Sequence, residues 1–462
     1  MAWAAANNDA FVPELWVKEG LALLTENMVI GNLVHRDFQN EIKGFGDVVN
    51  TRKPSAFTFH RKTDSVAVTN QDAVSTNVPV ALNQWGHVSF MIYDGEQSTS
   101  FTDLVNIYLT PAMNALATGI DKTLLGQQHA FRANNAGRLG LLGSTTAWPY
   151  MLEADKVMND NNVPVIGRNL IISTAAKKSI LESTTFHEAQ KVGDQGSALR
   201  NASIGRAAGF DIFMCQNTPS YTYTDTVADA VNLVGGYAAG STVILVDDIT
   251  GIVVGSYVKI VGDGTPQLVT AVGASTTNEM TIAPGLYHAV ANDAVITSYS
   301  PGLLDESATA AAGMTTEVTI DNLDSTKDIQ VGQCVSFGTA SVVADADAHY
   351  TMIQVTDSTG NTFEVLLDRP VDAALVNNAI ACMYPSGDYN LAFHRNAIAL
   401  VTRPLALPRA GTGVLAAAGE HKGISLRICM TYDGSAQGTR VTCDLLYGVK
   451  VLDASLGCVM YG

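Results

Sequence analysis

The 462-residue sequence is short of charge and has no long apolar run. Charged residues make up 15% of the chain, whereas soluble globular proteins average about 25%. Apolar residues make up 47%, so the shortage of charge favours a chain that buries much of its surface in permanent contacts. No apolar run reaches about 18 residues, and residues 1–10 lack the basic and apolar regions of a signal peptide. We therefore expect no membrane span, and synthesis in the cytoplasm.

The cysteines are scattered singly and form no Cys-x-x-Cys pair, which excludes the usual zinc and redox motifs. They predict buried free thiols rather than disulfides. The six are Cys215, Cys334, Cys382, Cys429, Cys443 and Cys458. The formal net charge of −17 argues against tight nucleic-acid binding but does not argue against enclosing nucleic acid.

The sequence contains no complete catalytic or metal-binding motif among those considered below. None of the nine histidines lies in a His-Glu-x-x-His helix, and no Gly-x-Ser-x-Gly elbow occurs. Asp345, Asp347 and His349 could offer metal ligands, but the glycine and the acid of an EF-hand loop are missing, so a solvated loop is expected. The glycines of residues 137–143 lack the preceding strand of a dinucleotide loop. We therefore expect that the protein is not an enzyme and that it has no cofactor and no metal site.

The N-terminal region predicts a helix and then a long β arm. Pro13 suits a first helical turn, and an amphipathic pattern that includes Trp16 runs to about residue 34, with Gly20 and Gly31 as expected bends or ends. Residues 44–93 then alternate between apolar and polar, as strands do. An isolated two-stranded ribbon is only marginally stable in water, so we expect this arm to lie on a neighbouring copy of the chain.

The arm also carries the densest basic cluster of the sequence, Arg52, Lys53, Arg61 and Lys62. One interpretation is a solvated hairpin surface; the other is ion pairing with acids of a neighbouring copy. The sequence leaves both open. These four residues and Trp16 are the candidates for contacts between subunits.

A second long helix is expected over residues 100–132. A capping-box pattern opens it at residues 100–103, and apolar residues recur at every fourth position from residue 104 to residue 124. Pro111 should kink this helix or unwind it locally. Residues 146–220 then predict an α/β unit, with a short helix from Pro149 and a buried strand at residues 170–173 followed by a helix.

Residues 221–385 are rich in Val, Ile and Thr and contain an internal repeat. VGSYVKI at residues 254–260 matches VGQCVSF at residues 331–337, and residues 288–296 match residues 373–380. Two tandem β modules, at about 221–300 and 301–385, are predicted. Residues 386–462 return to strands, with a hairpin at Asp433 and Gly434, so the α/β unit is interrupted by the modules and then completed.

This order of elements resembles the major capsid proteins of tailed bacteriophages, the Hong Kong 97-type fold, in the branch that carries an inserted β-barrel domain. The likeness covers about residues 1–220 and 386–462. The segments that carry it are FVPELW at 11–16, EIKGFGDVVN at 41–50, NLAFH at 390–394, Arg440, and DLLYG at 444–448.

The resemblance implies an α+β class and a division of the chain into the parts of that fold. They are the N-terminal arm (1–43), the extended β-hairpin arm (44–93), the spine helix and peripheral region (94–145), the first part of the axial α/β domain (146–220), the inserted β domain (221–385), and the C-terminal strands that complete the axial and peripheral domains (386–462). The chain departs from the branch because it has two β modules where one is usual.

The resemblance also implies a function in the virion capsid. It implies self-assembly into the hexamers and pentamers of an icosahedral head that encloses double-stranded DNA, after synthesis in the host cytoplasm. A separate scaffolding protein, a portal and a decoration protein are the implied partners, with no membrane and no sequence-specific DNA contact. Two alternatives stay open: a nanocompartment shell of the same fold, and a glycan-binding or adhesive role for the inserted β domain.

Overall fold

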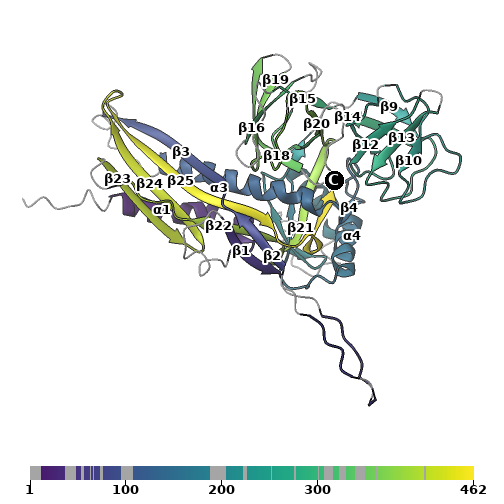
Figure 1. Cartoon of the computed structure of the whole chain (residues 1–462), viewed down its shortest axis with the longest axis horizontal. Coiled ribbons are helices and arrows are strands. Elements are labelled where there is room, and N and C mark those ends of the chain that lie inside the picture. Colours follow the sequence, from purple (N-terminus) through teal and green to yellow (C-terminus); the bar gives the residue numbers. More distant parts are fainter. Residues whose placement is uncertain are drawn as a thin grey trace, which may run out of the picture. The chain divides into compact units, whose positions relative to one another are not determined.

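The computed structural model describes residues 12–36, 48–53, 57–62, 64–65, 67–72, 76–94, 108–187, 204–221, 226–250, 252–274, 277–299, 301–305, 316–321, 329–338, 349–359, 362–409 and 413–462. The chain mixes helices and strands, which confirms the predicted α+β class (Figure 1). It divides into two units. Unit 1 holds residues 1–24, 35–116 and 398–452, and unit 2 holds residues 25–34, 117–397 and 453–462.

Unit 1 is built on a long antiparallel sheet. Strands β22 (Ile398–Arg403) and β24 (Ile424–Asp433) pair with β25 (Gly438–Val451), and β23 (Val414–His421) pairs with β24. The β24–β25 hairpin turns at Asp433 and Gly434, as the sequence predicts. Strand β3 (Gln84–Tyr93) lies along β25, and a separate ladder joins β1 (Val48–Lys53) to β2 (Thr76–Ala81).

Helix α1 (Val12–Asn27) packs on this sheet, and glycine is what allows the close approach. A Cβ at Gly419 of β23 would lie 2.6 Å from a methyl group of Val17, and one at Gly20 would lie 3.2 Å from Leu426. The expected bend at Gly20 is therefore wrong, because α1 runs through it. Gly20 serves packing against the sheet instead. Gly31 lies in the 3-10 turn η1 (Ile30–Asn32), beyond the end of α1.

Helix α3 (Thr110–Gly126) is the second long helix. Tyr108 and Leu109, just before Pro111, have π-helical geometry, a local interruption of the kind that the proline predicts. The expected capping box at 100–103 lies outside the described residues. The α-helix stops at Gly126 rather than at residue 132, and residues Gln127–Phe131 tighten into the 3-10 helix η3. The reason is side-chain competition, since His129 and Thr351 both contact the carbonyl oxygen of Gly126.

Unit 2 contains an α/β layer with β21 (Gly387–His394) at its centre. Strand β21 pairs with β26 (Gly457–Tyr461), β5 (Arg168–Ile172) and β8 (Ser220–Tyr221). Beyond them lie β4 (Asn135–Gly137), β7 (Phe210–Met214) and β6 (Arg206–Ala207). Helices α4 (Ala147–Asp160), α5 (Thr174–Glu182) and α6 (Thr184–His187), with the 3-10 turns η4 (Arg395–Ala397) and η5 (Ala454–Leu456), complete the layer.

Two β modules follow β8 along the chain. The first β module contains β9 (Thr226–Ala230), β10 (Val243–Leu245), β11 (Tyr257–Ile260), β12 (Gln267–Val272), β13 (Glu279–Ala283) and β14 (Val295–Tyr299). The second contains β15 (Gly302–Leu304), β16 (Glu317–Asp321), β17 (Cys334–Phe337), β18 (His349–Thr359), β19 (Thr362–Leu367) and β20 (Ile380–Met383).

The two modules have the same strand order. The first is a sheet ordered β10-β13-β12-β11-β14-β9, and the second is a closed barrel ordered β15-β16-β19-β18-β17-β20. If β9 to β14 are matched in sequence to β15 to β20, the first order becomes β16-β19-β18-β17-β20-β15. This is the order of the second module, because β15 and β20 are neighbours in the closed barrel. The backbone repeats in detail too. Gly255 and Gly332 have φ of +91° and +94° before β11 and β17, and Asp293 and Asn378 have φ of +59° and +60° before β14 and β20. These are the positions at which the two sequence repeats match.

Leu116 tests the buried face of α3. The Leu116 side chain is buried, with 5% of its surface exposed, whereas the adjacent Ala115 faces solvent. We expect Leu116→Asp to lower the free energy of unfolding by about 3–5 kcal/mol, because it buries an unpaired charge. Thermal unfolding measures this, with Ala115→Asp as the matched control. Equal melting temperatures for the two variants would contradict burial of this face.

Candidate assembly surface

The base of the β arm is anchored within unit 1. Strands β1 and β2 pair from Val48↔Ala81 to Lys53↔Thr76. The buried Val49, Val80 and Leu82 pack in one cluster with Ala399 and Val401 of β22. Apolar burial of this kind holds the ladder against its own chain.

The end of the arm is likewise part of unit 1. Strand β3 pairs with β25 over ten successive positions, from Tyr93↔Gly438 to Gln84↔Tyr447. The expectation that the whole segment 44–93 lacks anything of its own chain to fold against is therefore wrong for β3 and for the base of the arm. Period-two alternation predicts a strand but does not indicate which strand it pairs with. The partner of β3 is β25, more than 340 residues away in sequence.

Among the described residues of the arm, the part that we call the arm ribbon, residues 57–62 and 67–72, pairs with no strand of the unit 1 sheet. Thr58 and Gln71 exchange hydrogen bonds and join the two segments, at 2.8 Å from the Thr58 N–H and 2.5 Å to its carbonyl oxygen. Every described residue of the ribbon except Gln71 is exposed. Its large apolar side chains face solvent: Phe59 is 89% exposed, Val68 68% and Phe57 63%. Exposed apolar groups gathered on one element are typical of an interaction surface.

The predicted contact residues lie on three elements. Arg61 and Lys62 are exposed on the arm ribbon, and neither forms an ion pair within the described ranges. Arg52 and Lys53 lie on β1, opposite Asn77 and Thr76 of β2. Trp16 lies half-buried on α1. The ribbon thus carries two of the five candidates together with the exposed apolar residues.

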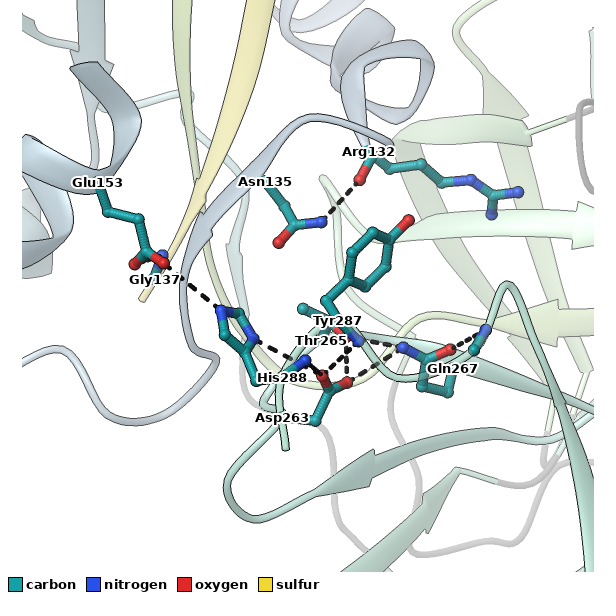
Figure 2. Close-up of polar contacts among 10 residues, drawn as sticks. Arg132, Asn135, Gly137, Glu153, Asp263, Thr265, Gln267, Tyr287 and His288 are labelled. Atoms are coloured by element: carbon teal, nitrogen blue, oxygen red, sulfur yellow. Dashed lines mark hydrogen bonds and ion pairs between the residues drawn. The ribbon is translucent and has the colours of Figure 1, made fainter. Parts of the chain in front are cut away.

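A buried carboxylate that the sequence analysis missed organises the first β module. The side chain of Asp263 is fully buried, and it accepts hydrogen bonds from the backbone N–H groups of Tyr287 and His288 at 2.8 and 2.7 Å (Figure 2). Gln267 Nε2 donates to it at 3.1 Å, and the Thr265 hydroxyl also donates. Four donors on one carboxylate are enough to compensate for its burial.

His288 links this carboxylate to helix α4. Its Nδ1 lies 3.6 Å from Asp263 Oδ1, and its Nε2 lies 3.4 Å from Glu153 Oε1. The other Glu153 oxygen accepts the N–H of Gly137 at 3.1 Å, so Glu153 fixes β4 as well (Figure 2). The Asp263 and Glu153 carboxylates together raise the pKa of His288 from 6.5 to about 9. In return, the hydrogen bond from His288 lowers the pKa of Glu153.

A second buried carboxylate attaches the second β module to η3. Asp368 accepts from the N–H of Thr351 at 2.8 Å and from Gln127 Nε2 at 3.0 Å. Burial raises its pKa to about 6, although the guanidinium of Arg369 at 3.5 Å opposes the shift. Burial also holds the pKa of His129 well below its usual value, and the positive charge of Arg369 acts in the same direction.

The contacts in these networks are hydrogen bonds and ion pairs among side chains and backbone groups. His288 contacts the carboxylates of Asp263 and Glu153, and His129 contacts the carbonyl oxygen of Gly126. In the described ranges, no group of three metal-binding side chains occurs. Asp345 and Asp347 lie outside those ranges, while His349 is buried in β18 and contacts the Tyr384 hydroxyl at 3.1 Å. Among the described helices, none is long and apolar enough to cross a membrane.

Comparison with known proteins relates the chain to phage structures. No family model matches it, and no curated protein matches it. A chain of a structure of Mycobacterium phage Che8 is 14% identical, with a TM-score of 0.44 over 94% of this chain and 90% of that one. A chain from the capsid structure of Cyanophage P-SCSP1u is 10% identical, with a TM-score of 0.45 over 94% and 88%.

A third structure is the asymmetric unit of the bacteriophage PhiM1 mature capsid. It is 10% identical to this chain, with a TM-score of 0.40 over 90% of this chain and 82% of that one.

The His288 network predicts a pH dependence. Because the pKa of His288 is raised in the folded state, its contribution to stability is fully present below about pH 6.5 and is lost as the pH rises through about 9. We expect His288→Gln to lower the melting temperature by a few degrees at pH 6 and by much less at pH 10. Calorimetry of both proteins across this range measures the difference. A constant difference at all pH values would show that the charge of His288 is not what matters.

Proposed function

We propose that this chain is the major capsid protein of a tailed bacteriophage. It assembles into the hexamers and pentamers of an icosahedral head that encloses double-stranded DNA. The observation that carries the proposal is the arm ribbon, which is held at its base by its own subunit and exposes Phe57, Phe59 and Val68. A second copy that covers these side chains would remove this apolar surface from water.

The composition supports the same function. A low share of charge suits a chain with large permanent contacts, and a net charge of −17 suits a shell that encloses DNA without holding it tightly. We extend the proposal to the division of the chain into the arms, spine, axial and inserted parts given above. A separate scaffolding protein, a portal and a decoration protein are the partners proposed with it.

The direct test is electron microscopy of the purified protein combined with nuclease treatment of the particles. Icosahedral shells that protect double-stranded DNA are the expected result. Shells that hold only protein cargo would favour a nanocompartment, and a chain that stays monomeric under all conditions would contradict a shell of either kind.

Charge reversal on the arm ribbon should separate assembly from folding. We expect Arg61→Glu with Lys62→Glu to raise the subunit concentration needed for assembly by at least about tenfold, because rim charges steer and pair with the neighbour. The melting temperature of the isolated subunit should not change, since both side chains are exposed. The control is Lys156→Glu with Lys178→Glu, which makes the same charge change on exposed positions of α4 and α5. Unfolding of the ribbon variant would show that the ribbon belongs to its own core.

The apolar side of the ribbon has its own test. Phe59→Ser removes a side chain that is 89% exposed in the subunit, so we expect unchanged stability and an assembly defect of about tenfold or more. Light scattering against subunit concentration measures the defect. Leu152→Ser, at a 45% exposed position of α4, is the control. Equal assembly of both variants would exclude Phe59 from the contact.

A further inference from the structure

A polar pocket of about 240 Å³ lies in unit 2, next to the Asp368 network, with which it shares Thr351. Lys122 of α3 lines it together with residues from three other segments. These are residues 216–220, which lead into β8, Val331 and Gly332 just before β17, and Thr351 and Met352 of β18. Three separate parts of the chain therefore meet around one lysine. Gly332 has φ of +94°, and a Cβ there would lie 3.4 Å from Pro219, so the wall is close-packed at that point.

The charge in this pocket is unbalanced. Of the described residues that line it, none is acidic, and within the described ranges Lys122 has no carboxylate at ion-pair distance. The neighbouring Asp121 does not serve, because its two oxygens accept the backbone N–H groups of Val29, Ile30 and Gly31 at 2.9–3.2 Å. Burial lowers the pKa of Lys122, as expected for a partly desolvated ammonium group without a counter-charge.

The other polar groups of the pocket suit an anion. The amide groups of Gln216 and Asn217 and the hydroxyl of Ser220 can all donate hydrogen bonds, and Lys122 contributes three N–H donors. A cation would meet the ammonium group at close range, which excludes it. The volume holds a carboxylate with one or two waters but is smaller than typical cavities for drug-sized ligands, which begin at about 300 Å³.

We propose that this pocket receives an aspartate or glutamate side chain from a second copy of the chain. The inference rests on the proposed shell function. Each copy carries 44 acidic against 27 basic side chains, so a neighbouring copy presents many carboxylates to a lysine that has none. The same excess of negative charge disfavours a nucleic-acid phosphate as the occupant, because a polyanion would be repelled by the rest of the surface.

Assembly of charge variants tests the proposal. We expect Lys122→Gln to raise the subunit concentration needed for half-maximal assembly by about tenfold, and Lys122→Arg to restore most of the loss. Lys178→Gln is the control, because Lys178 is 76% exposed and lies on α5. Melting temperatures of the isolated subunits show whether each variant folds. Assembly of Lys122→Gln at the wild-type concentration would overturn the proposal.

Chemical labelling of the wild-type chain gives a readout that does not depend on a variant. Lys122 should be reductively methylated by formaldehyde and cyanoborohydride in free subunits and be protected by about tenfold in assembled shells, as measured by mass spectrometry against Lys178. Equal labelling of Lys122 in both states would contradict occupancy. If titration with inorganic phosphate alone protected Lys122 in free subunits and shells did not, the pocket would be a phosphate site and the proposal would be wrong. Failure of the wild-type chain to form any shell would instead contradict the proposed function.

Discussion

The α/β layer of unit 2 depends on strand β21, because two distant parts of the chain must meet there. Residues 135–221 supply five of its strands, β21 and β26 supply the others, and both β modules lie between β8 and β21 in sequence. Asn390, fully buried in β21, accepts the N–H of Ser173 at 2.8 Å and donates to the carbonyl oxygen of Met460 at 3.2 Å. One side chain therefore ties β21 to the end of β5 and to β26. An apolar residue at this position would leave both backbone groups without these partners.

The attachment of the two modules shows how repeated units diverge. Their strand order and their left-handed turns are the same, yet each is fixed by a different buried carboxylate. The first uses Asp263, in the turn after β11, with His288 reaching Glu153 of α4. The second uses Asp368, directly after β19, which accepts from Gln127 of η3. The two modules share their strand order, and they differ in the buried carboxylate that attaches each one to the rest of unit 2.

Local patterns in the sequence predicted the elements whose causes are local. The hairpin at Asp433 and Gly434, the buried strand β5 and the interruption near Pro111 follow from turn chemistry, apolar runs and the missing proline N–H. The matching segments at 254–260 and 331–337 likewise lie at equivalent places in the two modules. Elements of this kind need no knowledge of distant partners.

The remaining features depend on contacts between residues far apart in sequence. Gly20 looked like a helix breaker, but its role is set by Leu426 on the sheet. The partner of β3 and the meeting of His288 with Glu153 join residues separated by more than 130 positions, and no local pattern encodes such pairs. Of the candidate assembly surface, the sequence predicted the basic residues and the alternating ribbon, but not that the base of the arm and its return strand β3 are anchored in unit 1.

The ends of the inserted region lie side by side in one ladder. Tyr221 pairs with Gly387 and Ser220 with Asp388, at the point where β8 meets β21, and the Tyr221 and Tyr389 rings stack with their centroids 5.4 Å apart. Paired positions of an antiparallel ladder are only about 5 Å apart, a gap that a tight turn can close. The two modules can therefore be deleted, duplicated or replaced together by a short turn or another domain, without changing the register of β8 against β21.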